Sequence, residues 1–491
     1  MQAGETKRVI LLGLDFGSTT SSALLASAKI ARSSATGHMQ LDDVKVLYKS
    51  EPVFTPFANQ NIDIEKVAKL IANWFAESGV KVAEIFSGGS MITGLAAQAH
   101  NAAALSKLIT SIVGESVIVT ANDARLESWL AFMGSCAALS RYHADVPIIN
   151  FDIGGGTTNV ALGVNGDVQQ TGCYFIGARH FQFVPGSYQI VTLSSCGAAL
   201  LEALNITKKI GETLSADEIA KIMAFYVSAL EAIVLGDADF LSTQITKIHS
   251  QVAIQLSSQT KPSMTFSGGV GELIYKIAAG EALPSTTFFG DFGIDLALAI
   301  ANSPILSANL KTHMPEHKGR ATVVGLTLHA TEISGNTIYL PNQKHLSQTN
   351  DLSKTNDLPL RNLPIIARLF SDSTADQWHS AFTLAANCQQ GACIQISACI
   401  QISASNTLEQ IRTFAAHIRH ALQASKYAPS KPLVILVDTN IGKALGNYIC
   451  DWGQSQYNLM VIDEVTLRNA QFVHIGRVHQ GMIPVSFYGL S

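Results

Sequence analysis

Apolar residues recur along the chain in two patterns: short runs of the kind that form buried strands, and longer stretches with helical spacing. Helical spacing marks residues 64–79 and 123–139. Short apolar runs that end in small residues mark 82–94 and 115–121 as strands. Because strands and helices alternate in this way through most of the chain, the pattern predicts layered α/β domains.

One apolar run is interrupted by polar residues. In LLGLDFGSTTSSALL, residues 11–25, an acid, a glycine and a cluster of hydroxyl residues break the run, which then resumes. A related pattern, IINFDIGGGTTNVALGV, occupies residues 148–164. The two aspartates, Asp15 and Asp152, are 152 − 15 = 137 residues apart, about the length of one domain. We therefore expect two related lobes, each opening with a β-hairpin whose turn carries an aspartate.

The chain is too long for one hydrophobic core, since it has 491 residues and single cores stop growing at roughly 250–300. A break between domains is expected at residues 341–364, where the sequence becomes polar, contains three prolines and repeats the tetrapeptide TNDL. We expect lobes over 1–147 and 148–340, a linker over 341–364 and a small C-terminal α/β domain over 365–491. A tandem copy of CIQISA at 393–404 fits a local duplication in that last domain.

Composition and charge exclude several classes of protein. Hydrophobic residues make up 47% of the chain and charged residues 14%, which favours packed cores over a disordered chain. The formal net charge is −4 and no Lys/Arg block stands out, so no nucleic-acid partner is expected. The sequence shows no secretory signal and no apolar stretch of membrane-spanning length, so we expect no membrane partner and a cytoplasmic location. Seven scattered cysteines without a C-x-x-C pair indicate reduced thiols.

The two interrupted runs have the chemistry of phosphate sites. Glycines let the backbone approach an anion, turn amides donate to it, and Ser/Thr hydroxyls add further donors. Neither turn contains the lysine of a P-loop. Two aspartates that face each other across a cleft would instead hold a hydrated Mg²⁺ between the β- and γ-phosphates of a nucleotide. Asp15 and Asp152 are the candidates for this role.

A third stretch fits the other end of a nucleotide. MTFSGGVGELIY, residues 264–275, reads as a strand that ends in Ser-Gly-Gly and is followed by the start of a helix. Backbone left open by Gly268, Gly269 and Gly271 would pack against adenine and ribose, where a Cβ would collide.

These three motifs, in this order, resemble the phosphate, phosphate and adenosine motifs of the actin, sugar-kinase and heat-shock-chaperone ATPase superfamily. Within it, the chain resembles the ethanolamine ammonia-lyase reactivase family over nearly its whole length. The narrower resemblance rests on ITGLAAQAHNA (92–102), RLESWLA (125–131), RATVVGLTLHA (320–330), LPLRNLPI (358–365), GKALG (442–446) and VIDEV (461–465). It implies an actin-like ATPase fold, in which two related ribonuclease H-like lobes surround a nucleotide cleft, plus a small C-terminal α/β domain.

The resemblance also implies roles for individual residues. Asp15 and Asp152 would bind Mg²⁺, and Asp152 would also take part in catalysis. Glu127 lies where family members place a group that orients the attacking water, with a solvated helix charge as the alternative. ATP would be contacted from three segments: Gly17, Ser18, Thr19 and Thr20; Gly154, Gly155, Gly156, Thr157 and Thr158; and Ser267, Gly268, Gly269, Gly271 and Glu272.

The function implied is that of an ATP-dependent, chaperone-like reactivating factor. Its partner would be ethanolamine ammonia-lyase, on which damaged cobalamin is exchanged for intact adenosylcobalamin, with slow ATP hydrolysis as the switch. The C-terminal domain would face that partner, and association with the ethanolamine-utilisation microcompartment is left open. Two departures stand out: Leu95 replaces the glutamate that usually follows ITG, and 343–357 is longer than usual. A small-molecule kinase and a filament-forming ATPase of the same fold remain as alternatives.

Overall fold

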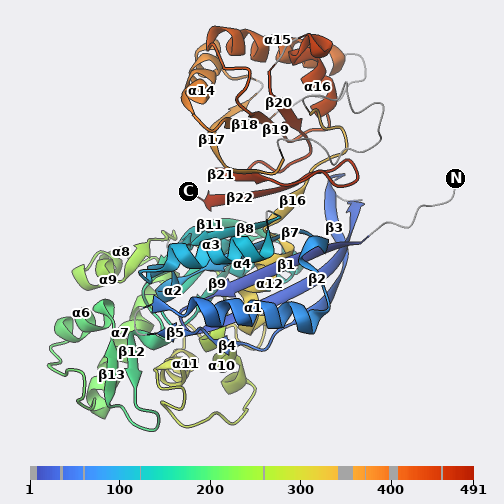
Figure 1. Cartoon of the computed structure of the whole chain (residues 1–491). Helices are drawn as coiled ribbons and strands as arrows, with labels where there is room; N and C mark the ends of the chain where they lie inside the picture. Colours follow the sequence, from blue (N-terminus) through green and yellow to red (C-terminus); the bar gives the residue numbers. More distant parts are fainter. Residues whose placement is uncertain are drawn as a thin grey trace.

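Three large β-sheets organise the protein (Figure 1). The computed structural model describes residues 8–33, 37–58, 61–114, 116–121, 123–257, 260–340, 358–370, 372–397, 407–454 and 457–490. The expected insertion at 343–357 and the second CIQISA copy at 399–404 lie outside these residues.

The first sheet carries the first of the two repeated motifs. Its strand order is β3 (Met39–Lys49), β2 (Thr20–Arg32), β1 (Val9–Phe16), β7 (Ile85–Ile92) and β8 (Val117–Ala121), with β4 (Val53–Phe54) also paired to β2. β1 and β2 form an antiparallel hairpin, β2 pairs antiparallel with β3, and β7 and β8 continue the sheet in parallel. Helices α1 (Ile64–Ser78) and α3 (Ala102–Val113) pack on it through apolar faces that include Ile71 and Ile109.

The second sheet carries the second motif and repeats the order of four strands of the first sheet. It runs β14 (Ser250–Val252), β11 (Asp167–Tyr174), β10 (Thr158–Val164), β9 (Ile148–Ile153) and β15 (Ser263–Ser267). Here β9 and β10 form the antiparallel hairpin, β11 pairs antiparallel with β10, and β15 pairs parallel with β9. The repeat seen in the sequence is therefore a repeat of the fold, and both predicted hairpins are present.

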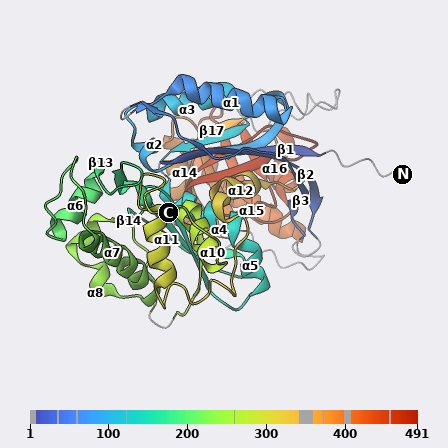
Figure 2. The ribbon, with the colours of Figure 1, turned by 90° about the horizontal axis from the view of Figure 1, so that it is seen from below.

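Two helices cross between these sheets. α12 (Ala321–Leu328) contacts β1, β2 and β7, whereas α4 (Ala124–Ser135) contacts β9, β10 and β11. Both lie near the centre of the molecule in Figure 2. A Cβ built on Gly134 would lie 2.0 Å from the carbonyl oxygen of Ala321, and one on Gly325 would lie 2.0 Å from that of Leu130. Glycine on each helix is what allows the two backbones to touch.

The remaining helices and short strands cover the two lobes. The longest, α7 (Ala216–Leu235), starts at a capping box formed by Ser215 and Glu218 and ends at Gly236 in a left-handed conformation. It shares the largest hydrophobic core with β9 and β15, in which Phe151 and Phe266 stack. The others are α2 (Gly94–Gln98), α5 (Ala137–Tyr142), α6 (Ser195–Ala203), α8 (Ala238–Leu241), α9 (Gln244–Ile248), α10 (Gly268–Ala278), α11 (Gly293–Asn302), β5 (Phe57–Ala58), β6 (Asn61–Ile62), β12 (Phe181–Phe183) and β13 (Ile190–Leu193).

The third sheet occupies the upper part of Figure 1. Its order is β16 (Thr331–Ile333), β22 (Pro484–Leu490), β21 (Ala470–Ile475), β17 (Leu360–Phe370), β18 (Ala392–Ser397), β19 (Leu433–Val437) and β20 (Leu459–Ile462). The four strands from β17 to β20 are parallel, and helices α14 (Ala375–Asn387), α15 (Thr407–Ala424) and α16 (Gly442–Ile449) share a hydrophobic core with them.

Two strands of this sheet bear on the expected linker over 341–364. β17 begins at Leu360, inside the segment 341–364, which we expected to be a linker because of its prolines and polar residues. Leu363 packs into a hydrophobic core with residues of the neighbouring strands, so this part of the segment belongs to the sheet. β16 precedes that segment but pairs with β22 near the end of the chain. The domain boundaries themselves stay predictions.

The predicted fold class is confirmed. Two sheets that share a four-strand order, β3-β2-β1-β7 in one and β11-β10-β9-β15 in the other, each open with a hairpin and are joined through crossing helices. They form an actin-like ATPase fold, and a further α/β sheet follows them. Within the described residues, none of the helices combines the length and apolar character that a membrane crossing requires.

Candidate functional site

The turns of the two repeated hairpins have the same local structure. In the first turn the backbone N–H of Gly17 donates to the carbonyl oxygen of Thr20 at 3.0 Å. In the second the N–H of Gly154 donates to the carbonyl oxygen of Thr157 at 2.9 Å. Each turn thus closes on itself directly after a strand that carries an aspartate as its penultimate residue, Asp15 in β1 and Asp152 in β9. The aspartates lie at the strand ends, one step before the turns in which we expected them.

These two turns meet in space. A Cβ built on Gly155 would lie 2.1 Å from Oγ1 of Thr19, and one built on Gly156 would lie 3.0 Å from Oγ of Ser18. Segments 137 residues apart therefore pack against each other, and the glycines of the second turn make room for the hydroxyls of the first.

A cleft of about 420 Å³ opens beside the meeting point of the turns. Its walls come from both lobes and from the segment around α10, as the three-motif interpretation requires. The residues expected at the site that line it are Asp15, Gly17, Ser18, Thr19, Thr20, Glu127, Asp152, Gly154, Gly155, Gly156, Thr157, Gly268, Gly269 and Glu272.

Asp152 is held by hydroxyl groups from two other elements. Oγ of Ser267 donates to its Oδ1 at 2.6 Å, and Oγ1 of Thr322 donates to its Oδ2 at 3.5 Å. Burial raises the pKa of Asp152 to about 6, and these two hydrogen bonds limit the rise. The carboxylate is therefore fixed in direction but costly to ionise.

Asp15 faces the same cleft with one oxygen unsatisfied. Its Oδ1 is buried and has no hydrogen-bond partner among the residues that the structure describes. Burial, together with the charge of Asp152, raises the pKa of Asp15 to about 7. An unpartnered carboxylate oxygen beside a second buried acid fits a bound cation, because Mg²⁺ is held in proteins by one or two carboxylates plus water and phosphate. These residues therefore fit the metal that the sequence predicted.

Glu127 lies in the first turn of α4, whose N-cap is Asp123. Burial and the charges of Asp15 and Asp152 raise the pKa of Glu127 well above its ordinary value, whereas hydrogen bonds with Asn159 and Thr93 oppose the rise. Three acids from three separate segments thus influence one another inside one cleft. A cluster of perturbed acids in a cleft is typical of a functional site.

A comparison with known protein families matches nearly the whole chain. The profile of the family described as "Ethanolamine utilisation protein EutA" matches residues 7–490. The chain belongs to the EutA family. This confirms the resemblance drawn from the sequence motifs.

Individual relatives extend over the same length. The ethanolamine ammonia-lyase reactivase EutA of Salmonella typhimurium is 25% identical to this chain, and that of Escherichia coli is 24% identical; each alignment covers 99% of both proteins. Among solved structures, a Ppx/GppA family member from Aquifex aeolicus is 13% identical with a TM-score of 0.32, covering 66% of this chain and 88% of its own.

Three residues expected in the EutA-family site lie behind the cleft wall instead of on it. The hydroxyl of Thr158 donates to the carbonyl oxygen of Ile176 at 2.7 Å, and Ser267 acts through Asp152. A Cβ on Gly271 would lie 2.9 Å from the carbonyl carbon of Phe266, so glycine at this position allows α10 to pack closely against β15. These residues support the site from outside the cleft.

The adenosine motif keeps the local structure that the sequence indicated. Gly268 has φ +79°, and a Cβ there would lie 2.4 Å from the carbonyl oxygen of Ile153, so glycine is required. In the part of the chain that the structure describes, no atom beyond its neighbours and its own helix backbone lies within 4 Å of a Cβ built on Gly269, which therefore presents open backbone to the cleft. The side chain of Leu95, where the sequence departs from the reactivase pattern, lies outside what the structure describes.

Sequence reasoning missed several residues of the cleft. Asn159 could have been predicted from the sequence, because it directly opposes Asp152 in the hairpin register, as Ser22 opposes Asp15. Others come from segments with no recognised motif or from stretches used only as marks of the family. The additional polar and aromatic lining residues are Ser22, Phe54, Thr93, Asn159, Lys276, Phe289, Asp291, Arg320 and Thr322.

Proposed function

We propose that this chain is an ATP-dependent reactivating factor for ethanolamine ammonia-lyase. The proposal is supported by membership of the EutA family and by relatives, aligned over 99% of their length, that are named ethanolamine ammonia-lyase reactivase EutA. The observation that carries the ATP-dependent part is the meeting of the Gly17 and Gly154 turns beside Asp15, Glu127 and Asp152.

Within the cleft, each group has a distinct task. The backbone amides and hydroxyls of the two turns bind the phosphates from both lobes, and the open backbone at Gly269 receives the adenosine end. Asp15 and Asp152 hold Mg²⁺, which when bound offsets the charge of the phosphates. Glu127 orients the attacking water through its carboxylate and accepts a proton from it.

The nucleotide acts as a switch because it touches both lobes. A ligand shifts a conformational equilibrium only by its differential affinity for the two forms, and about 1.4 kcal/mol is needed for each tenfold change. Contacts to the γ-phosphate from turns on opposite lobes favour the closed form, and hydrolysis removes them. Slow hydrolysis coupled to release of a partner follows from this arrangement, and rapid metabolic turnover does not.

The partner step is the exchange of damaged cobalamin for intact adenosylcobalamin on the target enzyme. The sheet from β16 to β22 and its helices, which a minimal kinase lacks, form the part that faces the target. This role belongs to the cytoplasmic ethanolamine-utilisation system.

The test is reconstitution. Purified chain is mixed with ethanolamine ammonia-lyase inactivated with its damaged cofactor, with Mg²⁺ and with or without ATP and adenosylcobalamin. We expect lyase activity to return only when both ATP and adenosylcobalamin are present, and ADP alone not to replace ATP. Transfer of phosphate from ATP to ethanolamine or a sugar would instead support the small-molecule kinase, and nucleotide-dependent sedimentation of polymers would support the filament-forming ATPase.

A further inference from the structure

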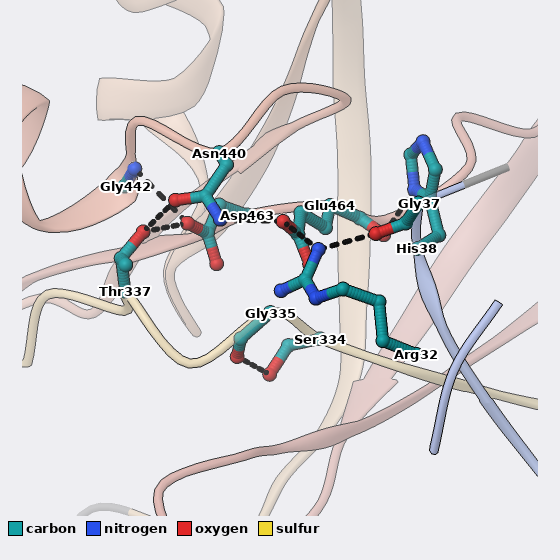
Figure 3. A network of polar contacts seen from close by, with 10 residues as sticks. All are labelled: Arg32, Gly37, His38, Ser334, Gly335, Thr337, Asn440, Gly442, Asp463 and Glu464. Atoms are coloured by element: carbon teal, nitrogen blue, oxygen red, sulfur yellow. Dashed lines mark hydrogen bonds and ion pairs between the residues drawn. The ribbon is translucent and has the colours of Figure 1, made fainter. Parts of the chain in front are cut away.

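A second pair of buried acids lies outside the nucleotide cleft, where the first lobe meets the third sheet (Figure 3). Asp463 and Glu464 directly follow β20 and belong to the VIDEV stretch. The relative exposure of Asp463 is 0% and that of Glu464 is 6%. The nucleotide mechanism uses neither residue.

Each carboxylate has one satisfied oxygen. Oδ2 of Asp463 accepts from the hydroxyl of Thr337 and from the backbone N–H of Gly442 at 3.3 Å. Oε1 of Glu464 accepts from Nη1 of Arg32 at 2.9 Å and from Nδ2 of Asn440 at 2.5 Å. These contacts, drawn in Figure 3, fix the orientation of both side chains.

The other oxygen of each carboxylate has no partner among the described residues. Within the described chain, Oδ1 of Asp463 and Oε2 of Glu464 are buried and accept no hydrogen bond. Both converge on Gly335, since a Cβ built there would lie 2.6 Å from Oδ1 and 2.8 Å from Oε2. The absence of a side chain at Gly335 therefore leaves room for two bare carboxylate oxygens at one place.

The backbone is strained to hold this arrangement. Glu464 has φ +56°, a left-handed conformation that residues other than glycine seldom adopt. Such strain persists where the surrounding structure determines it and clusters at binding sites.

The negative charges of Asp463 and Glu464 exceed the positive charge beside them. Among the described residues, Arg32 forms the one ion pair with this group, so two carboxylates share one guanidinium. Burial raises the pKa of Asp463, and the charge of Glu464 adds to the rise. An excess negative charge away from water needs compensation.

We propose that Asp463 and Glu464 bind one hard divalent cation through the two unpartnered oxygens, Oδ1 and Oε2. Carboxylate oxygens are the preferred ligands of Ca²⁺ and Mg²⁺, and Ca²⁺ accepts the more irregular geometry. The competing occupant is a proton shared by the two carboxylates, which would satisfy the same oxygens without a metal.

The cation would strengthen the junction between the first lobe and the third sheet. Arg32 belongs to β2, and Nδ1 of His38 contacts the carbonyl oxygen of Glu464 at 3.1 Å, so the loop bearing the acids is tied to the β2–β3 end of the first sheet. Since the cation binds the folded arrangement of two acids, its binding stabilises the native state.

The test is calorimetric titration of Ca²⁺ into the full-length, nucleotide-free protein. Asp152→Asn serves as the control that alters the cleft and leaves this site intact. We expect one Ca²⁺ per chain to bind in Asp152→Asn, and its affinity to fall at least tenfold when Asp463→Asn or Glu464→Gln is added. Thermal unfolding gives a second readout: Ca²⁺ should raise the Tm of Asp152→Asn, and adding Glu464→Gln should abolish that rise.

Three results would overturn the inference. They are no Ca²⁺ binding by Asp152→Asn, binding that survives both acid substitutions, and a Tm that responds to pH at these acids but not to Ca²⁺. The last result would assign the site to a shared proton. Since the proposed reactivase function concerns the nucleotide cleft, these results leave it untouched, and loss of ATP-dependent reactivation would not affect this inference.

Discussion

At the scale of single residues, the acids of the cleft combine fixed geometry with an unfavourable charge. Asp152 is oriented by Ser267 and Thr322, and Asn150 in turn donates to Oγ of Ser267 at 2.8 Å. Such a chain of hydrogen bonds holds a carboxylate ready for a metal at a cost in stability when no cation is bound. This arrangement leads to two predictions for one substitution.

The first concerns activity. Asp152→Asn keeps an oxygen that can accept from Ser267 but removes the charge that would hold the proposed Mg²⁺. We expect ATP-dependent reactivation to fall at least about tenfold, equivalent to about 1.4 kcal/mol, with an unchanged circular dichroism spectrum. Asp167→Asn, which alters an exposed acid of the same lobe, should have no effect. Full reactivation by Asp152→Asn would remove this aspartate from the mechanism.

The second concerns stability and pH in protein free of nucleotide and metal. The pKa of Asp152 rises from 3.8 to about 6 on folding, so the native state binds more protons than the unfolded state between these values. Stability from this group is therefore present below pH 4 and is lost as pH rises through about 6. At pH 8, the free energy of unfolding of Asp152→Asn should exceed that of the parent by up to about 3 kcal/mol, so the variant should unfold at a higher temperature. At pH 4 this difference should vanish, and thermal melts at the two pH values measure it.

At the scale of elements, the crossing of α4 and α12 positions Glu127. Gly134 and Gly325 allow backbone contact between the helices, so a methyl group on either one must push them apart. Gly325→Ala should lower the free energy of unfolding by about 1–3 kcal/mol. It should also lower ATP hydrolysis, because α4 carries Glu127. Thermal melts and steady-state ATPase assays measure both, and Gly134→Ala should reproduce the result from the facing helix. An unaltered melt in both variants would contradict the close crossing.

The elements also show what the sequence could predict. The paired hairpins and the strand–helix unit at 263–278 were recoverable because each motif is local and the first recurs. The helix predicted over 123–139 instead ends at Ser135, and α5 starts at Ala137 after a break at Cys136. Apolar spacing continues through that break, so periodicity alone did not reveal it.

The site was less predictable than the fold for a physical reason. Thr322 reaches Asp152 from 170 residues away, and Arg320 joins the cleft wall from the same segment. Such residues are brought in by the packing of α12 between the sheets, and no local pattern in the sequence indicates that packing. The buried pair at Asp463 and Glu464 escaped notice likewise, since its open space depends on Gly335, distant in the sequence.

At the scale of the whole molecule, the helix that carries Glu127 is also held by the third sheet. Asp123, the N-cap of α4, accepts from the backbone N–H of Leu126 at 3.1 Å and from that of Gly489 in β22 at 2.6 Å. Further along α4, the guanidinium of Arg468 lies 4.3 Å from the ring centre of Trp129 and pairs with Glu332. The cleft and the proposed partner-facing region thus share one helix.

This shared helix gives the last prediction. If nucleotide state is transmitted to the partner through α4, Arg468→Ala should separate ATP hydrolysis from reactivation. The rate of ATP hydrolysis should stay within about threefold of the parent, whereas reactivation should fall about tenfold. The reason is that a cation–π contact and an ion pair together contribute of order 1–2 kcal/mol. Arg412→Ala is the matched control, since Arg412 lies 5.4 Å from the ring centre of Tyr448 within the third sheet's own helices. Parallel assays of hydrolysis and reactivation decide the matter. Equal losses of both activities in Arg468→Ala would mean that this contact supports the fold of α4 and carries no signal from the nucleotide.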